Sequence, residues 1–156
     1  MYHGERFNAY SHLAGSMLAV AALVLMTVKA NDPYQLASAL TYGICLILLY
    51  LGSTLYHSIP QPKIKAILQK VDHCMIYLLI AGSYTPFTLI PLKGGWGWSL
   101  FGVSWGLALF GIIQELTIGR KSEKRLLSMM IYVIMGWLIL VAVSPLVRTL
   151  PFAGLF

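Results

Sequence analysis

The sequence has 156 residues, of which 58% are hydrophobic and only 10% are charged, and its net charge is +6 at pH 7. A soluble domain of this size cannot cover so much apolar surface, so the composition excludes an ordinary soluble protein and indicates an integral membrane protein. The basic residues form no stripe interleaved with exposed aromatics, so membrane lipids are the expected partners and nucleic acid is not.

Five apolar stretches are long enough to cross a bilayer, because about 20 helical residues span its hydrocarbon layer. The sequence therefore predicts an all-α membrane helical bundle that forms one domain over residues 1–156. The predicted spans are 8–29, 35–58, 72–92, 97–117 and 126–148, joined by short loops.

The first predicted span begins with two polar residues, Asn8 and His12, which together with Glu5 follow the i, i+3, i+7 spacing of one helix face. Arg6 before an apolar stretch is also typical of a cleavable signal peptide, although this stretch is longer than the usual apolar core of such a peptide.

The second predicted span ends with Tyr50, Ser53 and His57 at the same i, i+3, i+7 spacing. Pro60 and Pro62 are expected to stop this helix, because proline lacks a backbone donor and disfavours helix in the residue before it. His57 is therefore predicted to lie close to a helix end.

Asp72 opens the third predicted span, where it is interpreted either as a catalytic residue that holds a water or as a solvated residue at a helix N-terminus. His73 falls on a different face, with Tyr77 and Tyr84, and is interpreted as an interfacial or packing residue. Pro86 is expected to kink the helix.

The fourth predicted span contains Gly102 and Gly106 in a G-x-x-x-G pattern, which predicts close approach of another helix. Glu115 is interpreted as the charged end of this span. The fifth span contains Pro145, and the apolar segment 150–156 looks like the beginning of a sixth span.

Orientation follows from the basic residues, because short cytoplasmic loops are enriched in Lys and Arg. A cytoplasmic N-terminus places eight of them inside: Arg6, Lys63, Lys65, Lys70, Arg120, Lys121, Lys124 and Arg125. Only Lys29, Lys93 and Arg148 then lie outside. The predicted location is the cell inner membrane, with several crossings.

The same topology brings the polar residues of three spans to the cytoplasmic end, where Asn8, His12, Ser53, His57 and Asp72 are expected to form one cluster. Imidazole nitrogen with carboxylate oxygen favours zinc among the metals. We expect His57 to be the metal ligand, Asp72 to hold a water, and Ser53 to brace a ligand or an oxyanion. Asn8 and His12 support the cluster.

Three segments carry a resemblance to a known family: Gly4-Glu5-Arg6-Phe7-Asn8, Ser53-Thr54-Leu55-Tyr56-His57, and the run from Asp72 to Phe87. Together they resemble the hemolysin III family, the bacterial branch of the progestin and adipoQ receptor family. The resemblance implies seven helices, a cytoplasmic N-terminus and a zinc ion near the cytoplasmic face. It implies that zinc is held by His57 and by an H-x-x-x-H on the seventh helix, with Ser53 and Asp72 completing the site.

The sequence departs from that family pattern because it ends at Phe156 after five predicted spans and contains no H-x-x-x-H. We therefore expect a C-terminal truncation that lacks two helices. Zinc binding is expected to be weak or absent unless His12 or His73 replaces a missing ligand.

Three functions are compatible with these features. The first is a zinc-dependent hydrolase that cleaves a lipid amide or ester with a metal-activated water. The second, implied by the family name alone, is a pore-forming cytolysin; five strongly apolar spans instead favour residence in the producing cell's own membrane. The third is a receptor-like regulator of membrane lipid state with structural zinc.

Overall fold

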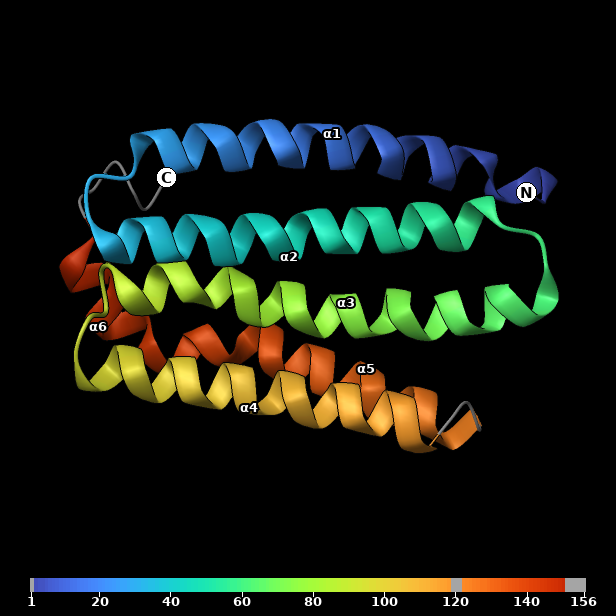
Figure 1. The fold of residues 1–156 in the computed structure, drawn as a ribbon. Helices are drawn as coiled ribbons and strands as arrows, with labels where there is room; N and C mark the ends of the chain where they lie inside the picture. The colour runs from blue at the N-terminus through green and yellow to red at the C-terminus, as the bar shows by residue number, and fades with distance from the viewer. Residues whose placement is uncertain (1, 119–121, 151–156) are drawn as a thin grey trace.

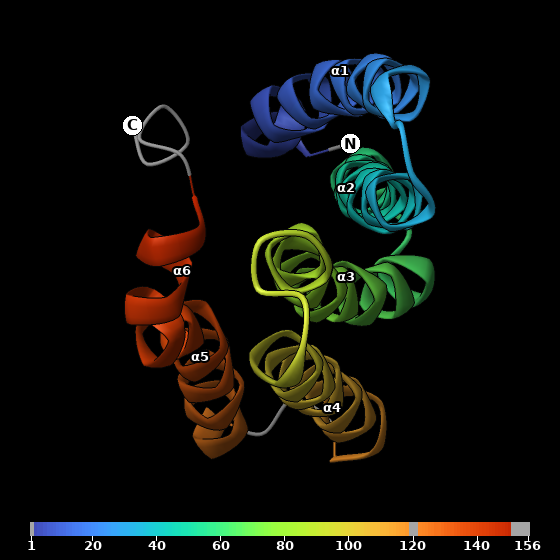
Figure 2. The ribbon, with the colours of Figure 1, turned by 90° about the vertical axis from the view of Figure 1, so that its left-hand side faces the viewer.

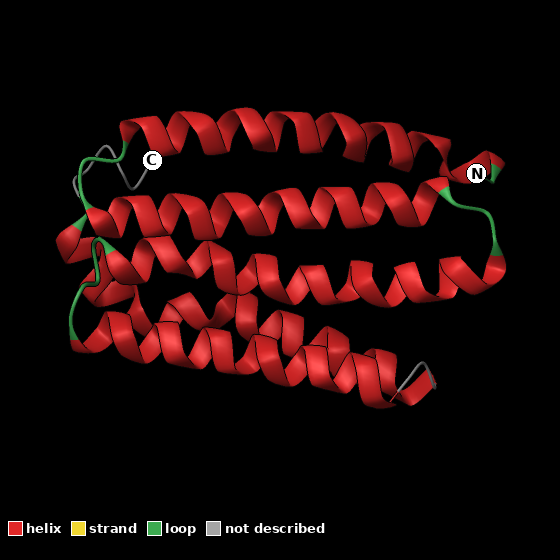
Figure 3. Ribbon diagram, in the orientation of Figure 1, coloured by secondary structure: helices red, strands yellow, loops and turns green. Residues whose placement is uncertain are grey.

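The computed structural model describes residues 2–118 and 122–150, and every regular element in these ranges is helical (Figure 3). This confirms the predicted all-helical membrane bundle. The elements in chain order are η1 (His3–Glu5), α1 (Arg6–Lys29), α2 (Pro33–Ser58), α3 (Pro62–Leu89), α4 (Gly95–Ile118), α5 (Ser122–Trp137), η2 (Leu138–Ala142) and α6 (Val143–Thr149).

Helices α1 to α4 lie side by side and alternate in direction (Figure 1). Viewed from one end they form a curved row, and α5 packs against α3 and α4 (Figure 2). η1, the α2–α3 loop, the end of α4 and the beginning of α5 all lie toward one end of the bundle, which we call the η1 end.

Within the described ranges, four helical segments are long and apolar enough to cross a membrane: Arg6–Lys29, Pro33–Ser58, Gly95–Thr117 and Leu126–Thr149. α3 has a similar length but a more polar composition, and it lies between α2 and α4, where some of its polar side chains, such as Thr85 and Thr88, are buried. Large apolar side chains such as Phe7, Leu18 and Val28 lie exposed on the outside of the bundle. Such a surface suits contact with lipid chains.

The helix starts have local causes. Asp32 caps α2, because its Oδ1 accepts hydrogen bonds from the backbone N–H groups of Tyr34 and Gln35. α3 begins at Pro62, which suits a first helical position. Asp72 therefore lies inside a helix, and the interpretation that it begins one is wrong.

The predicted fifth span is a broken helix: α5 ends at Trp137, η2 follows, and α6 begins at Val143. Pro145 explains the break, since its ring displaces the carbonyl four residues earlier and it has no N–H to donate. The buried Tyr84 hydroxyl donates to the carbonyl of Met135 at 2.7 Å and accepts from the Ile139 N–H at 2.9 Å. Tyr84 of α3 thereby satisfies backbone groups freed by the break.

Close helix contacts occur at glycines other than the predicted pair. A Cβ added at Gly102 or Gly106 would meet no atom of the described residues within 4 Å, so the expected close approach at this pattern does not occur among them. A Cβ at Gly111 of α4 would instead overlap the ring of Tyr77 on α3. In the same way a Cβ at Gly82 would lie 2.9 Å from the Cys45 sulfur. Close contact occurs where the faces of two helices meet. A spacing pattern on one helix does not show which of its faces meets a neighbour.

Two predictions concern residues outside the described ranges. The first concerns the basic loop residues Arg120 and Lys121. The second concerns the expected start of a sixth span in the segment 150–156, of which residues 151–156 are not described.

Candidate functional site

The first contact of the predicted cluster joins α1 to α2. His12 Nδ1 and Ser53 Oγ lie 2.6 Å apart and share a hydrogen bond, and Ser53 is 4% exposed. The Tyr50 ring stands edge-on to the imidazole of His12, with 5.7 Å between the ring centroids. A hydroxyl and an imidazole at this distance can exchange a proton.

His57 lies next to this pair, with its ring centroid 6.0 Å from that of His12. Its Nδ1 is buried and forms no hydrogen bond with the described residues. Glu5 Oε1 lies 3.6 Å from this nitrogen, which is longer than a hydrogen bond. A buried imidazole nitrogen without a hydrogen-bond partner is uncommon, which marks His57 as a candidate site residue.

Glu5 of η1 is held by Lys65 of α3. Lys65 Nζ donates to Glu5 Oε2 at 2.7 Å and to the Tyr56 carbonyl oxygen at 2.9 Å, and it lies over the ring of Tyr56. The Lys65 ammonium lowers the pKa of the Glu5 carboxyl below its ordinary value of 4.5, although partial burial opposes this shift. The resulting negative charge lies beside His57.

Two predicted members of the cluster, Asn8 and Asp72, do not take part in the hydrogen bond between His12 and Ser53. Asn8 is exposed, because the face of α1 that packs on α2 runs through the neighbouring Ala9 and a helix turns by about 100° per residue. Asp72 is half-buried on α3 and forms no ion pair with the described side chains. Its turn of α3 lies near α2, since a Cβ added at Gly52 would lie 3.5 Å from Met75.

The described residues do not form a complete metal site. They contain no group of three or more His, Cys, Asp or Glu side chains arranged to hold a metal ion. Catalytic zinc needs about three protein ligands. His57 offers an unpartnered nitrogen, but the described part of the chain does not supply a complete zinc site.

A second polar cluster, which sequence reasoning missed, joins α3, α4 and α5. His73 Nδ1 lies 3.0 Å from Glu115 Oε1, and Ser128 Oγ donates toward Glu115 Oε2 at 3.3 Å and Gln114 Oε1 at 3.1 Å. Tyr132 OH donates to the His73 carbonyl oxygen at 3.0 Å. Glu115 lies in the last turn of α4, as expected, but it is buried and contacts His73 and Ser128. An acidic residue at the end of an apolar span was the available signal, because such residues usually have partners.

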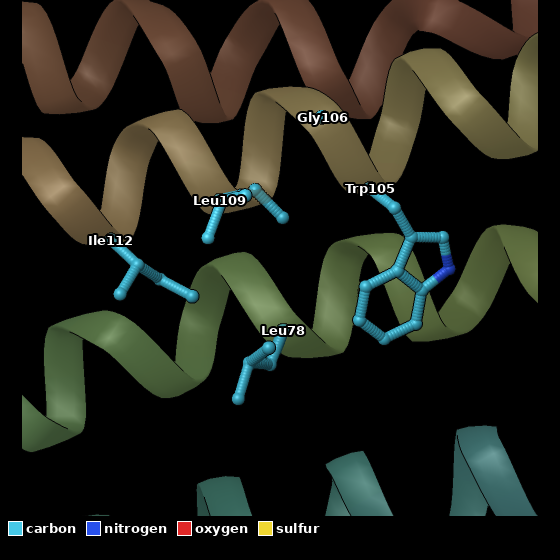
Figure 4. Close-up of a pocket in the computed structure, with 6 residues that line it drawn as sticks. Leu78, Trp105, Gly106, Leu109 and Ile112 are labelled. Carbon is cyan, nitrogen blue, oxygen red and sulfur yellow. The ribbon is translucent and has the colours of Figure 1, made fainter.

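A pocket of about 380 Å³ lies between α3 and α4 (Figure 4). Its lining consists of Leu78, Trp105, Gly106, Ala108, Leu109 and Ile112. The lining includes no side chain of either polar cluster, so the pocket contributes no acid or base.

Comparison with known proteins agrees with the sequence motifs. The profile of a family described as "Haemolysin-III related" matches residues 1–155. Hemolysin-3 of Bacillus cereus is 45% identical over 150 residues, which cover 94% of this chain and 67% of that protein. The Hemolysin-3 homolog of Bacillus subtilis (strain 168) is 43% identical over 153 residues, covering 96% and 71%.

A more distant relative is the human monocyte to macrophage differentiation factor, which belongs to the progestin and adipoQ receptor family. It is 27% identical over 141 residues, which cover 83% of this chain and 56% of the human protein. Comparison with solved structures gave no significant match.

Proposed function

The chain belongs to the haemolysin-III-related family, and we propose that it is a multi-pass protein of the cell inner membrane that cleaves a lipid amide or ester. The observation that carries the proposal is the cluster of His12, Ser53 and His57 on two adjacent helices of an apolar bundle. Polar groups at membrane depth are costly, so a cluster with an unpartnered imidazole nitrogen favours a functional site over packing alone.

In this proposal the residues of the chain orient groups and hold protons. When the His12 proton is on Nε2, the Ser53 hydroxyl donates to His12 Nδ1, and His12 can accept that proton. Glu5, held in place by Lys65, positions a carboxylate beside His57. Asp72 is proposed to orient the attacking water from the adjacent turn of α3.

Zinc is proposed to bind at His57, because neutral imidazole is a common zinc ligand. The described residues do not complete a zinc site, so we derive no reaction step through the metal and expect weak binding.

The metal proposal is tested by zinc titration of the purified chain. His57→Ala should abolish the weak binding, whereas His3→Ala, which removes a different imidazole, should leave it unchanged. Equal zinc binding by the wild type and His57→Ala would show that His57 is not a ligand.

Lipid cleavage is tested by reconstituting the chain in vesicles that contain a phospholipid ester or an N-acyl sphingoid amide. We expect release of fatty acid that falls at least about 100-fold in Asp72→Ala, the usual loss when a proton-transfer group is removed. Full activity in Asp72→Ala contradicts its role.

A dye trapped in the same vesicles separates the alternatives. Leakage without turnover would favour a pore-forming cytolysin, and zinc-dependent thermal stability without turnover or leakage would favour a receptor-like regulator.

A further inference from the structure

The α1–α2 and α3–α4 loops lie at the end of the bundle opposite the η1 end (Figure 1). A pocket of about 320 Å³ lies here, between the beginning of α2 and the α3–α4 loop. It is lined by Asp32, Pro33, Tyr34, Leu89, Ile90 and Lys93. The lining combines one acidic, one basic and one aromatic side chain with an apolar side. None of them belongs to the two polar clusters, so this pocket is a separate site.

The Lys93 ammonium group is held at the pocket by an aromatic ring and by the loop that carries it. Its Nζ lies 3.7 Å from the centroid of the Tyr34 ring, which is a cation–π contact. The buried Leu92 fixes the loop, because its N–H donates to the Phe87 carbonyl at 3.0 Å and its carbonyl accepts from the Gly97 N–H at 2.9 Å. Lys93 is exposed, yet these contacts set the position of its charge.

Asp32 provides the negative charge of the pocket. Its Oδ1 accepts the N–H groups of Tyr34 and Gln35, which holds the carboxylate at the beginning of α2. Its Oδ2 accepts no hydrogen bond from the described residues. Within the described ranges neither Asp32 nor Lys93 forms an ion pair. Both charges are therefore open to a ligand that carries both signs.

Exposed aromatic side chains indicate that the pocket lies at the level of lipid headgroups. Tyr34, Trp96 and Trp98 are exposed at this end of the bundle. Trp and Tyr concentrate where a bilayer meets water. Leu89 and Ile90 form the apolar side of the pocket, which suits the part of a lipid where its chains begin.

The two charges select among phospholipid headgroups. A phosphodiester suits the Lys93 ammonium, and a primary ammonium can donate hydrogen bonds to the open oxygen of Asp32. A glycerol headgroup brings no positive charge to Asp32. A choline headgroup brings the charge but has no N–H to donate. A phosphoethanolamine headgroup satisfies both residues.

We propose that this pocket binds the phosphoethanolamine headgroup of a membrane phospholipid, with its phosphate at Lys93 and its ammonium at Asp32. The lipid is bound intact. It links the beginning of α2 to the α3–α4 loop, since each end of the headgroup contacts one of them. The site is independent of whether the chain cleaves lipid.

The test identifies the lipids that stay bound to the purified full chain, by native mass spectrometry after extraction from vesicles. The vesicles contain equal amounts of ether-linked phosphoethanolamine, phosphocholine and phosphoglycerol lipids, which have no acyl ester or amide to cleave. The wild type should retain the phosphoethanolamine lipid in preference to the other two. Because turnover does not enter this measurement, its result is separate from that of the cleavage assay.

Two variants separate the two charges. Asp32→Asn removes the carboxylate and keeps a good helix cap, so the preference for phosphoethanolamine over phosphocholine should fall about 3-fold, as for a partly exposed charge contact. Lys93→Gln should weaken retention of both lipids alike, because both carry the phosphate. Lys29→Gln is the matched control, since Lys29 is an exposed lysine at the same end but outside the pocket; it should change nothing.

Equal retention of the three lipids by the wild type would overturn the proposal, and this measurement needs no variant. An unchanged preference in Asp32→Asn, or an equal loss in Lys29→Gln, would also overturn it. Soluble glycerophosphoethanolamine tests the source of the headgroup. It should not displace the lipid, because it lacks the chains that contact the apolar side. Displacement would contradict the assignment to a membrane lipid.

Discussion

At Glu5 one carboxylate contacts side chains from two helices, Lys65 Nζ at 2.7 Å and His57 Nδ1 at 3.6 Å. The contact with Lys65 anchors η1 to α3, while the contact with His57 places a negative charge beside the proposed metal ligand. The 3.6 Å separation is too long for a hydrogen bond, so the carboxylate acts on His57 only through its charge.

The Glu5–Lys65 contact predicts a specific loss of stability in acid. Because the pKa of Glu5 in the folded state lies below its ordinary value of 4.5, the contact stabilises the fold above that pH. The stabilisation is lost as the pH falls through the folded-state pKa. Glu5→Gln should be less stable than the wild type at pH 7 by under about 1 kcal/mol, and this difference should disappear in acid.

Thermal unfolding of wild type, Glu5→Gln, Lys65→Met and the double variant checks this prediction. The two substitutions should be less than additive at pH 7 and additive in acid. Additive effects at both pH values would show that the two residues do not interact.

At the scale of helices, small residues decide which faces meet. Gly111 of α4 lies against the ring of Tyr77, which is fully buried, whereas Gly102 of the same helix faces open space. Tyr77 and Tyr132 also pack with ring centroids 4.4 Å apart. The Tyr77 ring thus fills the junction of α3, α4 and α5.

Gly111→Ala should destabilise the bundle by about 1–3 kcal/mol, because the added methyl overlaps a ring that has no room to move. Gly102→Ala is the matched control in the same helix. It should be neutral or stabilising by up to about 1 kcal/mol, since alanine favours helix over glycine. Chemical unfolding in detergent compares the two variants, and equal stabilities would contradict the packing described for Gly111.

At the scale of the whole molecule, the alternating directions of α1 to α4 determine which loops share a side of the membrane. α3 has 28 residues and is about 42 Å long, enough to separate its ends across a bilayer. We therefore predict that Lys63 at its beginning and Lys93 just after its end face opposite sides. The excess of basic residues predicts that the Lys63 side is the cytoplasmic one.

Labelling of Lys63→Cys and Lys93→Cys with a membrane-impermeant maleimide tests this orientation. Both positions are exposed, and the native Cys45 and Cys74 are buried. Lys93→Cys should react in intact cells, and Lys63→Cys should react only after the membrane is opened. The reverse pattern would invert the assigned orientation.

Helical periodicity determined part of the site. The i, i+3, i+7 spacing predicted that His12 lies on one face of α1 and that Ser53 and His57 share one face of α2. The antiparallel connection of the two helices predicted that these residues lie at the same end of the bundle. Asn8 fits the same spacing but is exposed, because the interface passes through Ala9. Helical periodicity identifies the buried face of a helix to within roughly one residue. The packing of the neighbouring helix determines which of the adjacent residues is buried.

The sequence by itself determined the membrane-protein class, the helical bundle and the family, because each depends on composition or on local motifs. The tertiary structure alone decided that Glu5 lies beside His57, that His73 meets Glu115, and that Gly111 rather than Gly102 is the close contact. The physical reason is that a sequence pattern indicates only which residues share a face of one helix. These contacts depend on the distance and rotation between two helices.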